Sequence, residues 1–140
     1  MGFRITPSRS ESDEVMQVAP DIAVCPECLR DRKTQAQRLQ YPFVNCAHCG
    51  PRFSIIRDLP YDRSRTTISA FSMCPSCRKE YITVSDRRFH AESVACNHCG
   101  PSYYALYNKV KVTGYSELLN LSSRLLREGE VIAAEGIGAY

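Results

Sequence analysis

Short apolar runs separated by polar stretches characterise the first 100 residues of the chain. Apolar side chains are grouped at 21–24, 41–44 and 52–56. Runs of this length predict extended segments or short strands. The segment 30–40 between the first two runs is strongly polar and predicts at most weak helical structure. We therefore expect small units connected by loops over this part of the chain.

The last forty residues have a different pattern, which predicts a strand pair and a helix. Residues 103–107 and 109–112 have the alternating pattern that is typical of paired strands. Residues 116–127 predict a helix, because leucines recur along them at helical spacing and Gly129 follows as a stop signal. This helix is the one strong helical prediction in the chain.

After the helix, residues 131–134 predict a buried strand and residues 136–138 a turn. One helix and one strand cannot cover both of their own apolar faces. We therefore expect residues 108–140 to be the truncated start of a larger domain.

The cysteines give the chain its chemistry. All eight occur in Cys-x-x-Cys pairs with 17, 24 and 18 residues between successive pairs, at Cys25/Cys28, Cys46/Cys49, Cys74/Cys77 and Cys96/Cys99. Two copies of a C-x2-C-x17/18-C-x2-C pattern therefore stand in tandem, a spacing that fits four-thiolate zinc sites. Zn²⁺ accepts four thiolates tetrahedrally, and a site closed by four protein ligands is structural. The pattern predicts two structural Zn²⁺ ions with these eight cysteines as ligands and no catalytic residue.

Residues around the pairs suit tight turns. Pro26 and Pro75 fix the backbone inside two of the pairs. Gly50 and Gly100 directly follow the other two, where a left-handed backbone is often needed. Short strands entering and leaving each pair would then build a zinc-ribbon-like finger.

Disulfide bonds and redox-active thiols are the alternatives to zinc. Residues 1–18 are polar and contain no apolar signal segment, so we expect a cytoplasmic protein, in which cysteines stay reduced. We expect each repeat to bind its own ion, although the sequence leaves open a swapped pairing in which pairs from different repeats share one. His48 and His98 lie inside the second pair of each repeat, where we expect exposure or support of a ligand. His90 is expected to pack against the second finger.

Composition limits the other functions. A chain of 140 residues without tryptophan has a sparse core and usually needs a metal or disulfides to fold. It has no apolar run long enough for a membrane span. The formal charge is +3, but eight thiolates and two Zn²⁺ ions would bring it close to neutral, which argues against nucleic acid as a partner.

The second half of the cysteine region repeats the first. Residues 45–51 match 95–101, and 25–28 match 74–77, at an offset of 49 or 50 residues. The sequence therefore predicts a small, metal-stabilised α+β fold: two tandem four-cysteine zinc-ribbon-like fingers on short β-hairpins, followed by a helix-strand unit. The expected divisions are a flexible leader 1–20, a first finger 21–57, a spacer 58–72, a second finger 73–107 and the C-terminal unit 108–140.

Several stretches resemble one known family. The four cysteine pairs, the segments 41–53 and 59–63, and the motifs at 21–26 and 86–91 are similar to the HypF family, the carbamoyltransferases of [NiFe]-hydrogenase maturation. The resemblance covers essentially the whole chain. It implies a tandem zinc-finger module followed by the first helix and strand of a YrdC-like nucleotide-binding domain. Glu135 stands where the family usually has a lysine before its Gly-rich turn.

The resemblance also implies a function. Family members use carbamoyl phosphate and ATP to form a carbamoyl-adenylate, and pass the carbamoyl group to a cysteine of the partner HypE. On that basis we expect a zinc-binding module that is inactive alone and contacts a HypE-type protein or other domains of a full-length homologue. A stand-alone zinc adaptor or chaperone-like interaction module is the alternative, and a nucleic-acid-binding zinc ribbon is the weaker third.

Overall fold

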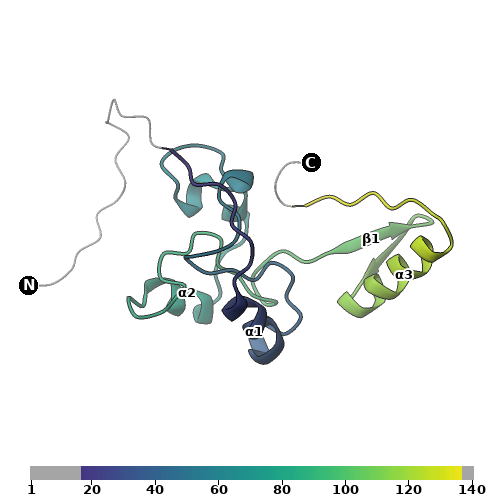
Figure 1. Ribbon diagram of the computed structural model, residues 1–140, viewed down its shortest axis with the longest axis horizontal. Coiled ribbons are helices and arrows are strands. Elements are labelled where there is room, and N and C mark those ends of the chain that lie inside the picture. The colour runs from purple at the N-terminus through teal and green to yellow at the C-terminus, as the bar shows by residue number, and fades with distance from the viewer. Residues whose placement is uncertain (1–16, 137–140) are drawn as a thin grey trace, which may run out of the picture.

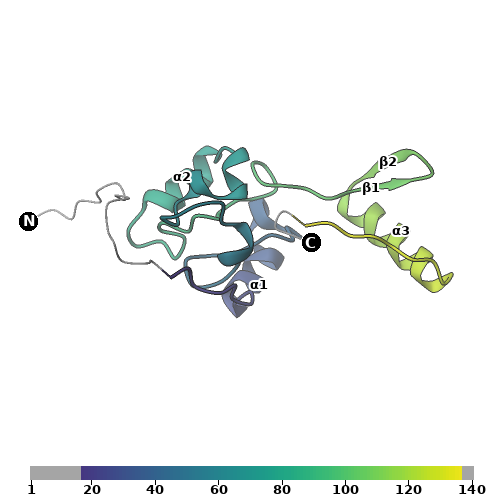
Figure 2. The same cartoon turned by 90° about the horizontal axis from the view of Figure 1, so that it is seen from above.

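The structure is a computed structural model that describes residues 17–136. Most of the leader expected at 1–20 and most of the turn expected at 136–138 lie outside these residues. Figures 1 and 2 show a body, which contains α1 (Pro26–Thr34) and α2 (Pro75–Ile82), and an arm that extends from it. The arm holds β1 (Tyr104–Tyr107), β2 (Val110–Thr113) and α3 (Tyr115–Arg127). Within 17–136, no helix has the length and apolar character needed to cross a membrane.

Each half of the body begins with a short helix that starts at a cysteine. Cys25 and Cys74 are the N-cap residues of α1 and α2, and a proline follows each of them at the first helical position. Proline suits this position because its fixed φ matches the helix and its missing N–H would have no helical partner there. The two Cys-x-x-Cys pairs at 25–28 and 74–77 are therefore helix N-termini and not turns of a hairpin.

The predicted strands at 41–44 and 52–56 are wrong. Within the described chain these segments are loop and a short 3₁₀ helix, η2 (Phe53–Ile55), with only isolated bridges such as Ile22 with Gly50. Tertiary packing overrides the apolar runs here, because Tyr41, Val44 and Ile55 are buried in the body without forming a strand ladder. The fold class stands as a small α+β domain with two four-cysteine clusters, but the fingers are built on helices and loops.

Gly50 and Gly100 are required for different reasons. Gly50 has a φ of +96°, the left-handed region that favours glycine, as the sequence predicts. Gly100 is not among the residues with positive φ. A Cβ at Gly100 would lie 1.9 Å from Oη of Tyr41 and 2.7 Å from Cβ of Ala95, so space and not backbone conformation excludes a side chain there.

The core of the body is small and contains charged residues. Cysteines, Tyr41, Val44 and Ala95 form its main cluster, and Ile55, Ile68 and Val94 are buried elsewhere. Arg38 in the 3₁₀ helix η1 (Ala36–Arg38) and Arg88 are also fully or almost fully buried, at 0% and 2% exposure. A buried charge needs partners, and these arginines find them in both halves of the body.

The segment between the two halves packs against the second half. It forms the 3₁₀ helices η3 (Arg63–Arg65) and η4 (Thr67–Ala70), and it contains a cis peptide bond before Pro60. The guanidinium of Arg63 donates to the carbonyl oxygens of Glu92, Val94 and Phe71, at 2.6, 2.9 and 2.7 Å. These bonds attach the segment to the loop that leads into the last cysteine pair.

The arm agrees with the sequence up to Arg127. β1 and β2 pair antiparallel with Tyr104 opposite Thr113, and Asn108 and Lys109 make the two-residue turn with positive φ. The helix predicted at 116–127 is α3, and β2 packs against it. The strand predicted at 131–134 is wrong, since these residues are unpaired in the described chain and Val131 is 95% exposed.

Candidate metal centres

The first cluster gathers four cysteine sulfurs from the first repeat. Cys25 and Cys28 come from the N-terminus of α1, and Cys46 and Cys49 come from the loop that follows η1. The Sγ atoms are 3.8 Å apart for Cys25 and Cys46, 3.7 Å for Cys46 and Cys49, and 3.6 Å for Cys49 and Cys28. All but Cys25 are buried.

The second cluster repeats this arrangement 49 or 50 residues later. Cys74 and Cys77 come from the N-terminus of α2, and Cys96 and Cys99 come from the loop after Val94. Sγ of Cys96 lies 3.7 Å from that of Cys74 and 3.8 Å from that of Cys99. The structure therefore groups the cysteines within each repeat, which decides the pairing that the sequence leaves open.

These separations fit a tetrahedral metal site. Four thiolates about 2.3 Å from one Zn²⁺ ion would place their sulfurs about 3.8 Å from each other. In both clusters the ligand atoms all lie within 4.8 Å of one another. A disulfide would require a separation of about 2.0 Å, and all eight cysteines are free. Each cluster can hold a metal ion, and the assignment of the cysteines as zinc ligands stays a prediction.

The electrostatics of the clusters also favour a bound cation. Burial raises the pKa of the Cys28 thiol and of the Cys77 thiol well above their usual range. For Cys74, burial alone would raise the pKa, but hydrogen bonds led by the backbone N–H of Cys77 lower it. Four sulfurs crowded in this way would be ionised together only if a cation compensates their charge, and a coordinated metal does so directly.

The histidines lie outside both clusters. His48 and His98 are exposed, and His98 contributes only its backbone N–H, which donates to Sγ of Cys96 at 3.4 Å. His90 packs with the rings of Tyr81 and Phe89, at centroid distances of 4.7 and 4.6 Å. The donor set of each cluster is therefore four sulfurs.

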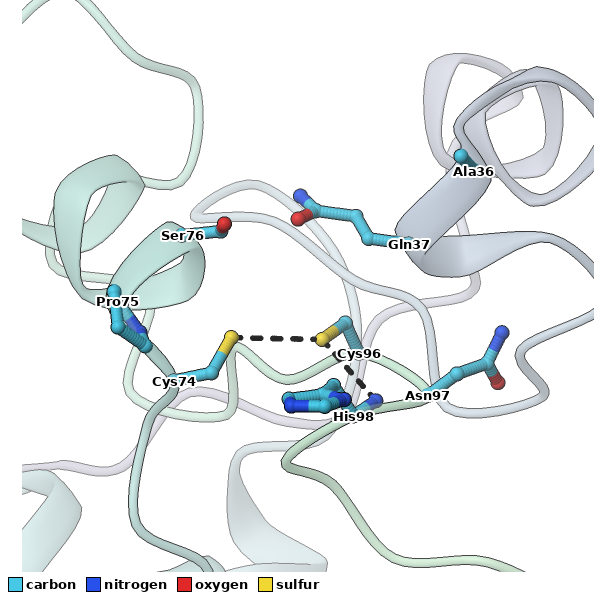
Figure 3. Close-up of a pocket in the computed structure, with 8 residues that line it drawn as sticks. All are labelled: Ala36, Gln37, Cys74, Pro75, Ser76, Cys96, Asn97 and His98. Atoms are coloured by element: carbon cyan, nitrogen blue, oxygen red, sulfur yellow. Dashed lines mark hydrogen bonds between the residues drawn. The ribbon is translucent and has the colours of Figure 1, made fainter.

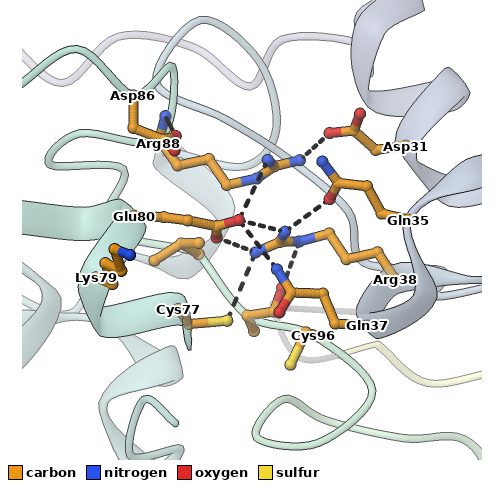
Figure 4. Close-up of polar contacts among 12 residues, drawn as sticks. Asp31, Gln35, Gln37, Arg38, Cys77, Lys79, Glu80, Asp86, Arg88 and Cys96 are labelled. Carbon is orange, nitrogen blue, oxygen red and sulfur yellow. Dashed lines mark hydrogen bonds and ion pairs between the residues drawn. The ribbon is translucent and has the colours of Figure 1, made fainter. Parts of the chain in front are cut away.

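A network of arginines and carboxylates extends from Cys77 of the second cluster to Asp31 in α1, the helix that carries two cysteines of the first cluster (Figure 4). Its centre is Arg38, whose Nη1 donates to Oε1 of Glu80 at 2.8 Å and whose Nη2 contacts Sγ of Cys77 at 3.5 Å. Arg88 donates to Asp31 and lies 3.8 Å from Glu80. Burial would raise the pKa of Asp31, but hydrogen bonds from Arg88 and Arg87 hold it below its usual range. Arg38 stays cationic because Glu80 outweighs the effect of its burial and raises its pKa.

The sequence did not identify these network residues as part of the site. Arginines are ordinarily found at the surface, whereas Arg38 and Arg88 are buried between the repeats. The signal that could have found them is their position: they stand 50 residues apart, the same offset as the cysteine pairs.

A shallow pocket lies over the second cluster (Figure 3). Its volume is about 480 Å³, and its lining includes Cys74, Cys96, Gln37 and Asn97. The side chain of Gln37 extends from η1 into the space above the two cysteines. The second cluster is thus open on the side that faces η1.

Taken together, the geometry defines a class of protein: a tandem four-cysteine metal-binding finger protein of small α+β fold. The model of the HypF finger matches this chain twice, at residues 24–56 and 73–106. The chain carries the HypF zinc-finger region and belongs to that family.

Relatives and solved structures agree with that assignment. The chain is 44% identical over 139 residues to the carbamoyltransferase HypF of Rhodobacter capsulatus, and 38% identical over 138 residues to a probable carbamoyltransferase HypF of Methanocaldococcus jannaschii. These alignments cover 99% and 97% of this chain but 18% of each relative. The crystal structure of full-length HypF in its phosphate- and nucleotide-bound form superposes with a TM-score of 0.73 at 44% identity, over 86% of this chain and 16% of that one. The chain therefore spans about one fifth of the length of the proteins it matches.

Proposed function

We propose that this chain is the structural zinc module of a HypF-type carbamoyltransferase that acts in [NiFe]-hydrogenase maturation. The observation that carries the proposal is the pair of four-sulfur clusters, each with separations that suit a tetrahedral ion. The names of the relatives supply the activity. Each cluster binds one Zn²⁺ ion, and the ions hold α1, α2 and the cysteine loops in one rigid body.

In this role the module performs no chemistry of its own. Both ligand sets are complete with four protein sulfurs, which leaves no open coordination position for a substrate or a water molecule. The module would position the domains that use carbamoyl phosphate and ATP, and its partners would be those domains or a HypE-type maturation protein. The chain alone is expected to show no pyrophosphate exchange dependent on carbamoyl phosphate.

A chimera tests the function. The matching 139 residues of the Rhodobacter capsulatus HypF are replaced by this chain, and carbamoyltransferase activity and hydrogenase maturation are measured. We expect the chimera to keep activity and a Cys46→Ser chimera to lose it together with one zinc ion. An inactive chimera that still folds and binds two zinc ions would contradict the proposal.

A stand-alone adaptor that binds other proteins is the second candidate. The arm favours it, because Leu106, Val110, Leu119 and Leu126 are exposed on the hairpin and α3. Cross-linking in the source cell distinguishes the two functions. Capture of a HypE-type protein or of a HypF homologue supports the first function, and capture of unrelated proteins alone supports the adaptor.

A further inference from the structure

The two repeats exchange equivalent contacts. Nε of Arg38 donates to the carbonyl oxygen of Ala95 at 3.2 Å, and Nε of Arg88 donates to that of Asn45 at 3.1 Å. Donors and acceptors in these two bonds are each related by an offset of 50 residues. Each arginine therefore crosses to the cysteine loop of the other repeat.

Neighbouring backbone bonds follow the same rule. The N–H of Ala47 donates to the carbonyl oxygen of Arg87 at 3.1 Å, and the N–H of Asn97 donates to that of Gln37 at 3.0 Å. Residues 37 and 87 are again 50 positions apart, as are 47 and 97. The repeats are thus arranged as a pseudo-symmetric pair. Residues 37–38 form hydrogen bonds with the cysteine loop of the second cluster, and residues 87–88 form them with the cysteine loop of the first.

The crossing side chains reach the sulfurs. Nη1 of Arg87 lies 3.2 Å from Sγ of Cys28 and 3.8 Å from that of Cys25, while its other nitrogen donates to Asp31. In the other direction, Nη2 of Arg38 lies 3.5 Å from Sγ of Cys77. A metal bound by four thiolates carries a net negative charge, which a guanidinium in hydrogen-bond contact with a sulfur stabilises.

The exchange is unequal at one position. The first cluster receives Arg87 in addition to Arg88, whereas the second cluster receives Arg38 with Gln37 at the position equivalent to Arg87. Nε2 of Gln37 donates to Glu80 at 3.0 Å, as Arg87 donates to Asp31. The pocket beside Gln37, Cys74 and Cys96 leaves room for a longer side chain. The second cluster therefore has the partner and the space for an arginine but not the arginine itself.

We propose that the two metal sites support each other crosswise: Arg87 of the second repeat positions and stabilises the ion of the first cluster, and Arg38 of the first repeat does so for the second. Position 37 then sets how tightly the second site holds its ion. The proposal rests on the proposed metal-binding function. It concerns the affinity of each site for a metal and not the activity of the enzyme.

The test uses the full chain loaded with ¹¹³Cd²⁺, whose two resonances are assigned to the clusters through their couplings to cysteine Hβ protons. Chelator is added stepwise, and the loss of each resonance gives the affinity of that site. Arg87→Gln should weaken the first site at least about tenfold and the second site much less. Arg38→Gln should show the reverse pattern, and Gln37→Arg should tighten the second site alone.

The crossed pattern distinguishes positioning from a general structural role. A substitution with only a structural effect would lower the metal affinity of the site in its own repeat, or of both sites equally. Arg78→Gln is the matched control, because Arg78 is an exposed arginine beside Cys77 in the sequence. Gln37→Arg keeps the test decisive if an arginine deletion does not fold. Equal loss at both sites, or no gain in Gln37→Arg, would overturn the crosswise support while leaving zinc binding intact. A wild-type chain that binds no ¹¹³Cd²⁺ would refute the proposed zinc module itself.

Discussion

Two arginines, Arg38 and Arg88, are buried in the core of the body, where larger domains usually have apolar side chains. Arg38 is completely buried, and Glu80, with 16% of its side chain exposed, supplies its counter-charge. Burying two charges is costly, so the pair is stable only while both members and their hydrogen bonds are present. Loss of either member would leave the other as a buried charge without compensation.

Glu80→Gln should therefore destabilise the body strongly. It leaves the Arg38 guanidinium buried without its carboxylate, and loss of one member of a buried pair costs about 3 kcal/mol or more. Urea denaturation of the metal-loaded chain measures the change in the free energy of unfolding. Asp58→Asn is the control, because Asp58 pairs with Arg65 at the surface and its removal should change stability by less than about 1 kcal/mol. Equal effects of the two substitutions would show that burial of the pair does not matter.

Gly100→Ala should also destabilise the protein, by about 1–3 kcal/mol, because the new methyl group would overlap Oη of Tyr41. That hydroxyl is buried without a hydrogen-bond partner among the described residues. Removing it in Tyr41→Phe should therefore cost little, and the double variant should recover part of the loss caused by Gly100→Ala. Thermal denaturation of the four proteins forms a double-mutant cycle, and strictly additive effects would contradict this packing argument.

The helices of the body and the helix of the arm are stabilised by different interactions. α1 and α2 are short, and each begins at a cysteine of a cluster, so tertiary contacts at the clusters, rather than helix propensity, hold them in place. α3 is longer and strongly amphipathic, yet none of its residues is buried. The hairpin covers α3 only in part, so apolar side chains such as Leu119 and Leu126 stay exposed in the arm.

Substitutions in the arm should leave the body unchanged. Leu121→Glu, on the half-buried stripe of α3 formed by Leu118, Leu121 and Leu125, should alter the unfolding free energy of the body by less than about 0.5 kcal/mol. Ile55→Ala, at a residue that is 1% exposed in the body, should cost about 2 kcal/mol or more. The rate at which a thiol reagent modifies the cysteines under denaturant reports on the body specifically. Faster modification in Leu121→Glu would mean that the arm supports the clusters.

The whole body depends on its two clusters. Its apolar core is small, and its segments are joined mainly through the cysteines and the arginine network. We therefore expect metal binding and folding to be a single process, as in other small metal domains.

Removal of metal by a chelator should unfold the body. We expect loss of the α1 and α2 signal in circular dichroism, exposure of all eight thiols to a reagent, and recovery when Zn²⁺ is returned. Native mass spectrometry should show two ions leaving as the charge-state distribution shifts to that of an unfolded chain. A chain that stays folded without metal would show that the arginine network suffices.

The sequence by itself determined the cysteine pairs, the duplication, the hairpin and α3, because these depend on local spacing and periodicity. It did not predict the helices that begin after Cys25 and Cys74, because a Cys-Pro-x-Cys sequence is equally compatible with a tight turn. Only the tertiary structure decided that each cluster forms within one repeat and that Arg38 and Arg88 are buried between the repeats. The physical reason is that a charge can be buried only where a distant partner compensates it, and the local pattern of apolar and polar residues does not identify such a partner.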